Sequence, residues 1–213
     1  MSFTNPGPDC PLCPRLAAYR AANRRANPTG FNAPVPGFGP LSARLLVVGQ
    51  APGVNGANTT GRPFTGDVAG RLLYAGLAQF GFATGTYAEH ANDGLTLHDC
   101  RVTNAVRCAP PQHKLETAEE KACRPFLERE LAAMPNLRVC LAIGEKPHKA
   151  LLQALGLKLS TYKFAHGAIH ALPHGLKLAD SFHTSQYNVN TGRITPAMFE
   201  AVLAGVATQL DLR

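Results

Sequence analysis

Long hydrophobic runs are missing from this 213-residue sequence. No apolar stretch approaches the roughly 20 residues that a membrane-spanning helix needs, so we expect no membrane segment. The first six residues lack the positive charge and apolar core of a secretory signal, so we expect a cytoplasmic protein. Internal repeats and low-complexity tracts are also absent, and the length suits one domain spanning residues 1–213.

Acidic residues are few. The chain has 14 Asp and Glu against 21 Lys and Arg, which gives a formal net charge of +7. A basic surface favours a polyanionic partner, and nucleic acid is the commonest one. Charge alone leaves two alternatives open, an acidic protein partner and a chain that is merely basic.

Six cysteines are present, and in a cytoplasmic protein they are more often ligands or reduced thiols than disulfides. Four of them form two pairs: Cys10 and Cys13 in a C-P-L-C motif, and Cys108 and Cys123 with fourteen residues between them. Four thiolates suit a zinc ion or an iron–sulfur cluster. One shared site would attach the N-terminal arm to the rest of the fold. The alternative is that all four are simply buried thiols.

Apolar runs and helical spacing alternate along the chain. Residues 1–40 form an irregular arm, rich in Pro and Gly, with a short helix near 15–25. We expect strands at 45–49, 100–106, 137–143 and 178–182, a strand or hairpin at 164–174, and helices at 68–80, 118–134, 146–155 and 196–210. Thr117 and Glu120 fit a capping box for the second helix, and Cys100 and Cys140 lie in strands as buried thiols. This order predicts an α/β fold with helices on both faces of a parallel sheet.

A glycine-rich loop, residues 49–67, follows the first predicted strand. It matches neither a phosphate-binding Walker A loop nor a dinucleotide-binding G-x-G-x-x-G motif. Its backbone N–H groups can hold a phosphate, a carbonyl oxygen or a water, and Gln50 offers a neutral amide. Phe64, on a tight turn, can stack on a flat base or pack onto the core. Asp67 can cap the next helix or orient a water.

Two more strands end at polar side chains, Asn104 and His183. Ligands of parallel sheets bind beyond the carboxyl ends of the strands, so we expect the three loops to meet at one rim. Asn104 has a donor and an acceptor for a pyrimidine edge, and His183 can stabilise developing negative charge. Ordinary loop hydrogen bonds are the alternative for both. The other seven histidines lie mostly in helical or hairpin settings and lack comparable neighbours.

Together these segments resemble the uracil-DNA glycosylases of the iron–sulfur branch, families 4 and 5, and most closely family 5, the type-b enzymes. The likeness rests on G-Q-A-P-G, G-A-N-T-T-G-R-P-F-T-G-D-V-A-G, T-N-A-V-R-C-A-P-P, L-A-I-G and H-T-S-Q-Y-N-V-N-T-G-R-I-T, and it extends from Cys10 to the last predicted helix. It implies a three-layer α/β/α fold with a short, mostly parallel, four-stranded sheet. It also implies a monofunctional DNA repair enzyme that flips uracil out of DNA and hydrolyses its N-glycosidic bond.

The resemblance implies a role for each motif residue. A structural [4Fe–4S] cluster would be held by Cys10, Cys13, Cys108 and Cys123. Phe64 would stack on the flipped base, Asn104 would bind its edge, and Ala51 and Gly53 would complete the base pocket. His183 would stabilise the charge on the departing uracil O2, and Asp67 would act on water. The residues Ser185, Gln186, Tyr187, Asn188 and Arg193 would contact DNA.

Two positions depart from the family pattern. Family 4 has an acidic residue, and the type-b branch an apolar one, where this chain has Gln50. The second motif usually reads H-P-S, whereas Thr184 replaces the proline here, and we expect a looser DNA-penetrating loop. Both departures bear on the catalytic water and on the substrate range, which includes hypoxanthine and xanthine for some relatives.

Two other functions fit parts of the sequence. A non-catalytic nucleic-acid-binding module, stabilised by zinc or a cluster, would explain the charge and the four cysteines, but not the polar residues at three strand ends. A nucleotide-binding α/β enzyme would use the glycine-rich loop for phosphates, although the matching motifs are missing. We expect a monomer whose partner is DNA that contains uracil or another deaminated base.

Overall fold

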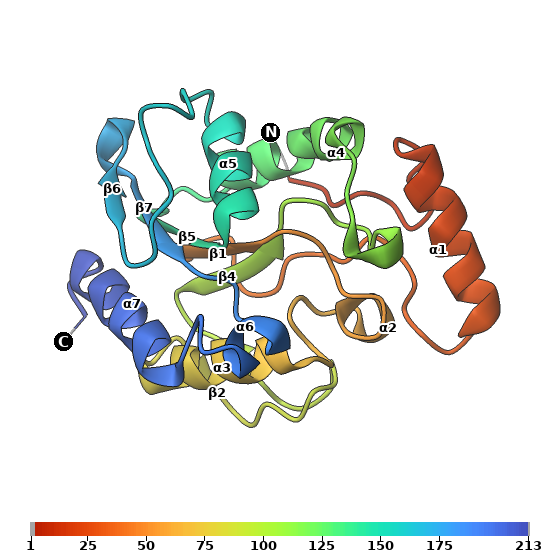
Figure 1. Cartoon of the computed structure of the whole chain (residues 1–213), viewed down its shortest axis with the longest axis horizontal. Coiled ribbons are helices and arrows are strands. Elements are labelled where there is room, and N and C mark those ends of the chain that lie inside the picture. Colours follow the sequence, from red (N-terminus) through yellow and green to blue (C-terminus); the bar gives the residue numbers. More distant parts are fainter. Residues whose placement is uncertain (1–2, 213) are drawn as a thin grey trace.

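The computed structural model describes residues 3–212. Its centre is a five-stranded sheet in the order β4-β1-β5-β7-β6 (Figure 1). Four strands are parallel, namely β1 (Leu45–Gly49), β4 (Cys100–Asn104), β5 (Val139–Ile143) and β7 (Lys177–Ser181). The fifth, β6 (Ile169–Ala171), pairs antiparallel with β7 at the edge. The predicted α/β fold is confirmed, and the sheet gains a fifth strand because residues 164–174 contribute one side of a hairpin.

Helices cover both faces of the sheet. On one face lie α3 (Val68–Gln79) and α7 (Pro196–Gln209), and on the other α4 (Thr117–Ala132) and α5 (Glu145–Ala154) (Figure 1). The alternation within β1 shows why: Leu45 and Val47 belong to the core under α3 and α7, whereas Leu46 and Val48 belong to the core under α4 and α5. A strand buried on both faces needs a continuous apolar run, as this one has. Cys100 and Cys140 are fully buried, as expected.

The N-terminal arm carries a 13-residue helix, α1 (Pro14–Ala26). The remaining elements are short: α2 (Ala57–Thr60), β2 (Ala83–Thr84), β3 (Thr96–Leu97), the 3₁₀ turns Pro111–His113 and Pro173–Gly175, and α6 (Gln186–Asn190). The sequence predicted α1 but not these short elements, because segments of two to five residues carry no clear periodicity. None of the helices in residues 3–212 combines the length and the apolar composition that crossing a membrane requires.

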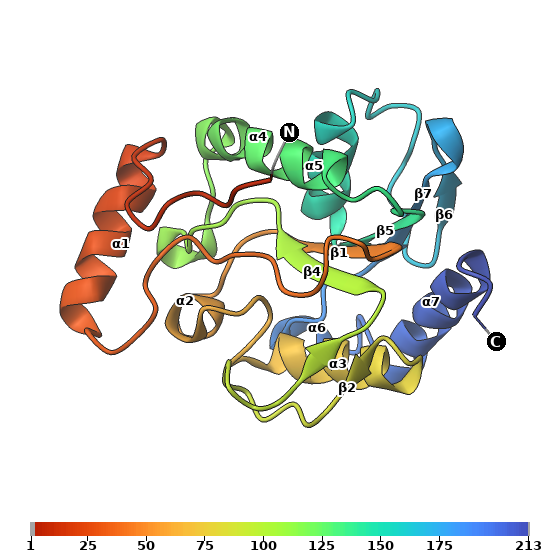
Figure 2. The same cartoon turned by 180° about the vertical axis from the view of Figure 1, so that it is seen from behind.

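The N-terminal arm lies along the outer edge of the sheet. Figure 2 shows α1 at one end of the molecule, beyond α2, with the chain returning toward β4. Phe38 and Val102 exchange two backbone hydrogen bonds of 2.8 Å, and the Val35 N–H donates to the Arg107 carbonyl at 2.7 Å. The arm therefore satisfies part of the open edge of β4 and lies beside the loop that carries Cys108.

The start of α4 differs from the prediction by one residue. Glu116 is the N-cap, and the Glu119 side chain accepts a hydrogen bond from the Glu116 N–H at 2.8 Å. The predicted capping pair, Thr117 with Glu120, is therefore wrong, because Thr117 is already helical. The sequence T-A-E-E allows both registers, and the structure uses the one in which Glu119 also binds Arg15 at 2.8 Å.

Candidate active site and cysteine cavity

The carboxyl ends of three parallel strands meet at one cavity of about 390 Å³. Gly49 lies opposite Asn104 in the β1–β4 register, and His183 follows the end of β7. Most of the candidate base-site and catalytic residues line the cavity: Gln50, Ala51, Gly53, Phe64, Asp67, Asn104, His183, Ser185 and Gln186. The convergence that the strand order implied is therefore present, and it joins segments more than 130 positions apart in the sequence.

Close approach of three elements explains the glycine at position 49. A Cβ atom there would lie 2.4 Å from Asn104 Oδ1 and 2.6 Å from Phe64 Cζ, so only glycine lets both side chains reach the cavity wall. Phe64 itself has a positive φ of 51°. The Tyr87 hydroxyl donates to the Phe64 carbonyl at 3.0 Å and holds this strained turn. The phenyl ring is consequently fixed against the cavity before any ligand enters.

Two carboxamides lie at the cavity wall. Asn104 is only 3% exposed and lines the cavity. Gln50 also lines it, and its Nε2 is buried without a hydrogen-bond partner within residues 3–212. Buried polar groups are normally satisfied, so the Gln50 amide has a free donor for a ligand or water, and the Asn104 carboxamide offers a donor and an acceptor at the same wall.

His183 is held as a neutral imidazole. Its Nδ1 accepts the Ser185 N–H at 3.0 Å, so in the neutral ring the proton sits on Nε2. Burial lowers the pKa of His183, and the nearby Asp67 carboxylate opposes that shift without reversing it. The Asn188 side chain donates to the His183 carbonyl at 2.8 Å and fixes the backbone. His183 can therefore act as a hydrogen-bond donor through Nε2 without carrying a charge.

Asp67 serves two purposes at once. Its Oδ1 accepts the Gly70 N–H at 3.2 Å and caps α3, as expected for an N-cap. Its Oδ2 faces the glycine-rich loop, where a Cβ on Gly56 would approach to 2.7 Å and one on Gly53 to 3.4 Å. One carboxylate oxygen is thus used by the helix, whereas the other lies at the cavity wall.

The loop after His183 is anchored more firmly than predicted. Thr184 is fully buried, and its hydroxyl donates to the Ala69 carbonyl at 3.1 Å. The expectation that threonine would loosen this loop is therefore wrong, because the hydroxyl ties it to α3. Tyr187, on α6, is 73% exposed beside the cavity. Arg193 does not line the cavity and instead lies over the Phe182 ring, 4.8 Å from its centroid.

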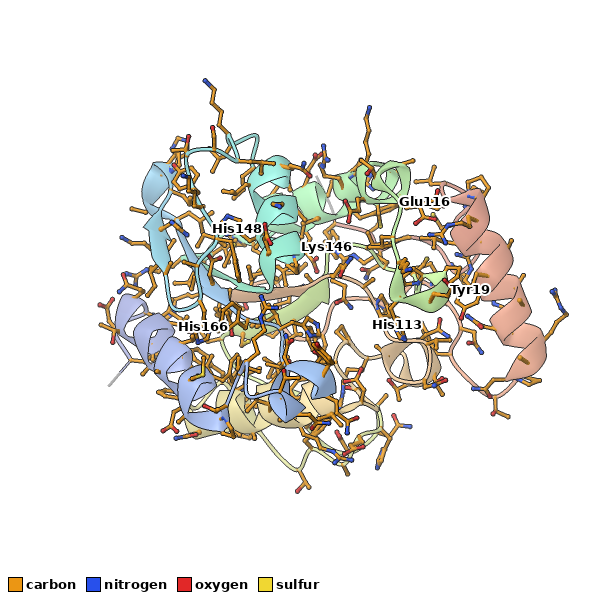
Figure 3. The ribbon with its side chains drawn as sticks, viewed as in Figure 1. Tyr19, His113, Glu116, Lys146, His148 and His166 are labelled. Carbon is orange, nitrogen blue, oxygen red and sulfur yellow. The ribbon has the colours of Figure 1, made fainter. Side chains whose placement is uncertain are left out.

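Several residues that line the cavity were not predicted from the sequence. They are Pro52, Ala57, Val68, Ala69, Pro110 and His113. His113 is exposed, has a positive φ of 58°, and lies on the turn before α4, toward α2 (Figure 3). The expectation that no other histidine is comparably placed is therefore wrong. Pro110 and Pro111 directly after a strand end were the available signal, because a stiff turn there must lie at the same rim.

A second, smaller cavity brings the four paired cysteines together. Cys10, Cys13, Cys108 and Cys123 all line it, with Leu16, Val106 and Phe126 among the apolar residues around them. All four are free thiols. Burial, followed by the neighbouring Cys123 and Cys108 thiols, raises the pKa of Cys13 to about 11. Four thiols around one cavity fit a bound cluster or cation, which would neutralise the thiolates.

Arg20 links the two cysteine pairs. It is only 6% exposed, and its guanidinium donates to Cys108 Sγ at 3.5 Å and to the Cys10 carbonyl at 2.9 Å. Burial raises the pKa of Cys108 to about 11, and the positive charge of Arg20 opposes this rise. Arg20 therefore favours the thiolate form that a metal site requires.

A buried ion network lies next to the loop that carries Cys108. Glu130 on α4 binds Arg101 of β4 at 2.7 Å and also Arg107, and all three side chains are at most 7% exposed. Arg107 precedes Cys108, and Glu130 lies on the helix that carries Cys123. The network therefore fixes the two elements that supply one cysteine pair.

Comparison with known proteins agrees with this arrangement. The family model of the uracil DNA glycosylase superfamily matches residues 36–207. The chain is 44% identical to a type-5 uracil-DNA glycosylase of Thermus thermophilus, over 91% of this chain and 90% of the relative. It is 39% identical to a type-5 uracil-DNA glycosylase of Mycobacterium leprae, over 91% and 88%. A type-4 uracil-DNA glycosylase of Pyrobaculum aerophilum is 33% identical over 57% of this chain and 55% of the relative.

Proposed function

The chain belongs to the uracil DNA glycosylase superfamily, and on that premise we propose that its rim cavity hydrolyses the N-glycosidic bond of uracil flipped out of DNA. The observation that carries this proposal is the convergence of Phe64, Asn104 and His183 from three strand ends on one cavity. An aromatic ring, a carboxamide at the cavity wall and a neutral histidine donor are what a flat, polar base requires. All of these residues come from one chain, so we propose a monomer.

The base is bound by Phe64 and Asn104 in this proposal. Phe64 provides a flat apolar surface for stacking, and base–aromatic stacking is typically worth about 1–3 kcal/mol. Asn104 can donate to one edge atom of the base and accept from another, because its carboxamide lines the cavity. Its donor and acceptor also suit hypoxanthine and xanthine, so we include both bases in the proposed substrate range.

His183 stabilises the leaving base. Cleavage of the glycosidic bond places negative charge on uracil, and the Nε2–H of the neutral ring can donate to it. The Ser185 N–H holds the other ring nitrogen, so the donor is oriented before the reaction begins. A fixed donor of this type typically contributes about 2.7–4 kcal/mol to the transition state.

Asp67 is the proposed water-activating group. Its free oxygen lies at the cavity wall, whereas Gln50 has only a neutral amide and cannot accept a proton from water. Gln50 instead can hold the water or the base through its unpaired amide. This assignment makes the carboxylate, rather than residue 50, responsible for the hydrolytic step.

DNA is held around the cavity by the 185–190 segment and by basic side chains. Tyr187 is exposed enough to enter the space that a flipped nucleotide leaves. A neighbouring cavity of about 290 Å³ shares Gln50 with the active site and is lined in part by Arg124, Lys146 and Lys149. These cations suit the phosphate backbone. Flipping costs least at a mismatch, so a G·U pair should react faster than an A·U pair.

We propose that the four cysteines hold a [4Fe–4S] cluster, with a zinc ion as the alternative. The cluster would be structural, because it would join the N-terminal arm to the Cys108 loop and to α4, away from the rim residues that contact the base. Four sulfur ligands, a largely apolar wall and the Arg20 donor support this assignment. A brown protein with broad visible absorbance and iron would support the cluster, whereas a colourless protein with one zinc would favour the alternative.

A glycosylase assay tests the function directly. Labelled duplexes with a single uracil, hypoxanthine or xanthine are incubated with the purified protein, and the abasic sites are cleaved with alkali. We expect cleavage of the uracil duplex only after alkali, which identifies a monofunctional enzyme. Intact oligonucleotides, with the metal centre fully loaded, would refute the proposed function.

A further inference from the structure

The loop between α5 and β6 touches the strand end that carries His183. His166 Nδ1 accepts the Phe182 N–H at 3.0 Å, and Phe182 directly precedes His183. The two rings also stack, with centroids 4.7 Å apart and planes within 7° of parallel. Figure 3 shows His166 on the side of the molecule that holds β7 and α7. His166 thus contacts the catalytic segment without lining the cavity.

His166 makes this contact as a neutral ring. A nitrogen that accepts a hydrogen bond carries no proton, and burial lowers the pKa of His166. Arg193 lies on the Phe182 ring as well, 4.8 Å from its centroid. Phe182 is therefore restrained through both its backbone N–H and its side chain, which fixes the direction in which the chain enters His183.

A buried network holds the loop that presents His166. The Asp180 carboxylate is fully buried and accepts hydrogen bonds from His148 Nδ1 at 2.7 Å, His170 Nε2 at 3.0 Å and the Ala165 N–H at 3.3 Å. His148 Nε2 donates to the Tyr162 carbonyl at 2.9 Å. Residues 162–165, just before His166, are therefore attached to α5 through His148 and to β7 through Asp180.

The same network does not need a metal ion. His148, His170 and Asp180 offer ligand atoms within 4.8 Å of one another, which is a spacing typical of metal sites. Each of those atoms, however, already has a partner of opposite hydrogen-bonding character. Both nitrogens of His148 face acceptors, which favours the protonated ring. Burial opposes its charge, but Asp180 and the Tyr162 carbonyl outweigh burial and raise the pKa of His148.

We propose that His166 is a positioning residue for His183, a role that rests on the glycosylase function proposed above. By accepting the Phe182 N–H, His166 fixes the backbone immediately before the catalytic histidine. The donor Nε2 of His183 is useful only where charge develops on the base, and a misplacement of about 1 Å can cost about 10²-fold in rate. The imidazole of His166 therefore contributes to the rate through geometry, without touching the substrate.

Two variants separate the hydrogen bond from the ring stacking. His166→Phe keeps an aromatic ring on Phe182 but removes the acceptor, whereas His166→Asn keeps an acceptor close to the position of Nδ1 but removes the ring. Single-turnover excision of uracil gives the maximal rate and the enzyme concentration at half saturation. We expect His166→Phe to lower the maximal rate about tenfold with unchanged half saturation, and His166→Asn to stay within about threefold of the wild type.

Equal losses in both variants, or none in His166→Phe, would overturn the proposal. An independent measurement uses the wild type and needs no activity: a scalar coupling across the hydrogen bond between the Phe182 amide nitrogen and His166 Nδ1 in a ¹⁵N-labelled sample. We expect the coupling to be present, and its absence would also overturn the proposal. A wild type that leaves uracil in DNA but shows the coupling would refute the proposed function and not the geometry.

Discussion

The rim cavity and the cysteine cavity differ in how their polar groups are arranged. At the rim, Gln50 Nε2 is unpaired within residues 3–212, Asn104 lines the cavity, and His183 presents an Nε2 donor to it. Around the cysteines, Arg20 pairs with Cys108, and Glu130 pairs with both Arg101 and Arg107, although Arg107 Nε itself has no partner within residues 3–212. The difference shows that the rim leaves uncharged polar groups available to a substrate, whereas charged groups beside the cysteines are paired with one another and hold the fold.

The largest effect should come from breaking the buried ion network of Arg101, Glu130 and Arg107. Glu130→Gln leaves the buried Arg101 and Arg107 without a counter-charge, and breaking such a group typically costs about 3–5 kcal/mol. We expect the free energy of unfolding, measured with denaturant, to fall by about that amount. Lys149, whose ion pair with Glu145 is exposed, offers a control: Lys149→Gln should cost about 0–1 kcal/mol. Similar losses in the two variants would contradict the role of the network.

The network also predicts how acid acts on the protein. Burial raises the pKa of Glu130, but Arg107 and Arg101 outweigh burial, and the net effect is a lowered pKa. A carboxyl whose pKa is lower in the folded state stabilises the fold above its unfolded pKa, about 4.3, and loses that contribution as the pH falls. The wild type should therefore lose more stability between neutral and acid pH than Glu130→Gln does, measured as the midpoint of denaturant unfolding.

At the rim, removing a charge should affect the rate and not the fold. Asp67→Asn keeps an N-cap for α3, because asparagine caps as well as aspartate, but it removes the proposed base. Such a base typically contributes about 10²-fold or more. We expect a single-turnover rate about 10²-fold lower, with DNA binding and the melting temperature nearly unchanged. A wild-type excision rate in Asp67→Asn would show that the Asp67 side chain only caps α3 and takes no part in hydrolysis.

Arg20 sharpens the comparison on the cysteine side. Arg20→Met keeps a long side chain over the cavity but removes the hydrogen bond to Cys108 Sγ and the positive charge beside it. We expect the bound metal centre to be lost to a chelator about tenfold faster, because partners of metal ligands typically matter by about 10–100-fold. Visible absorbance and metal content would follow the loss. An unchanged rate of metal loss in Arg20→Met would show that Arg20 does not stabilise the metal centre.

The smallest effect concerns pH. Burial lowers the pKa of His183 below the usual value of about 6.5, so the ring stays neutral as the pH falls through that value. We expect the single-turnover rate to show no step near pH 6.5 that is due to His183, and to fall only at lower pH as the ring gains a second proton. A wild-type rate that halves near pH 6.5, with the step removed in His183→Gln, would show an unperturbed histidine and contradict the proposed environment.

Strand order and motif position predicted the rim well. Parallel strands place their carboxyl ends on one side, so Gly49, Asn104 and His183 had to converge once the strands were recognised. The same logic explains why the cysteine pairs could be grouped but not placed: the arm has no periodicity, and its path depends on backbone contacts such as Phe38 with Val102.

Other features depend on contacts that no local pattern encodes. The buried Thr184 hydroxyl was expected to loosen a loop and instead bonds to Ala69, a residue 115 positions away. No local pattern distinguishes His166 or Asp180 in the sequence. In the structure, His166 accepts a hydrogen bond from Phe182, and Asp180 accepts hydrogen bonds from His148 and His170. His113 reaches the cavity because the turn before α4 gives it a positive φ. The roles of these side chains could not be predicted from the sequence, because they depend on contacts that form only in the folded chain.

The contribution of the oriented histidine donor is tested most directly by single-turnover uracil excision with His183→Ala. His174→Ala is the control, because His174 lies in the 3₁₀ turn before β7, at the other end of that strand. We predict that His183→Ala lowers the maximal rate by about 10²-fold or more while DNA binding is retained, and that His174→Ala leaves it unchanged. Equal rates for the wild type and His183→Ala would show that the rim does not stabilise the departing base through this residue.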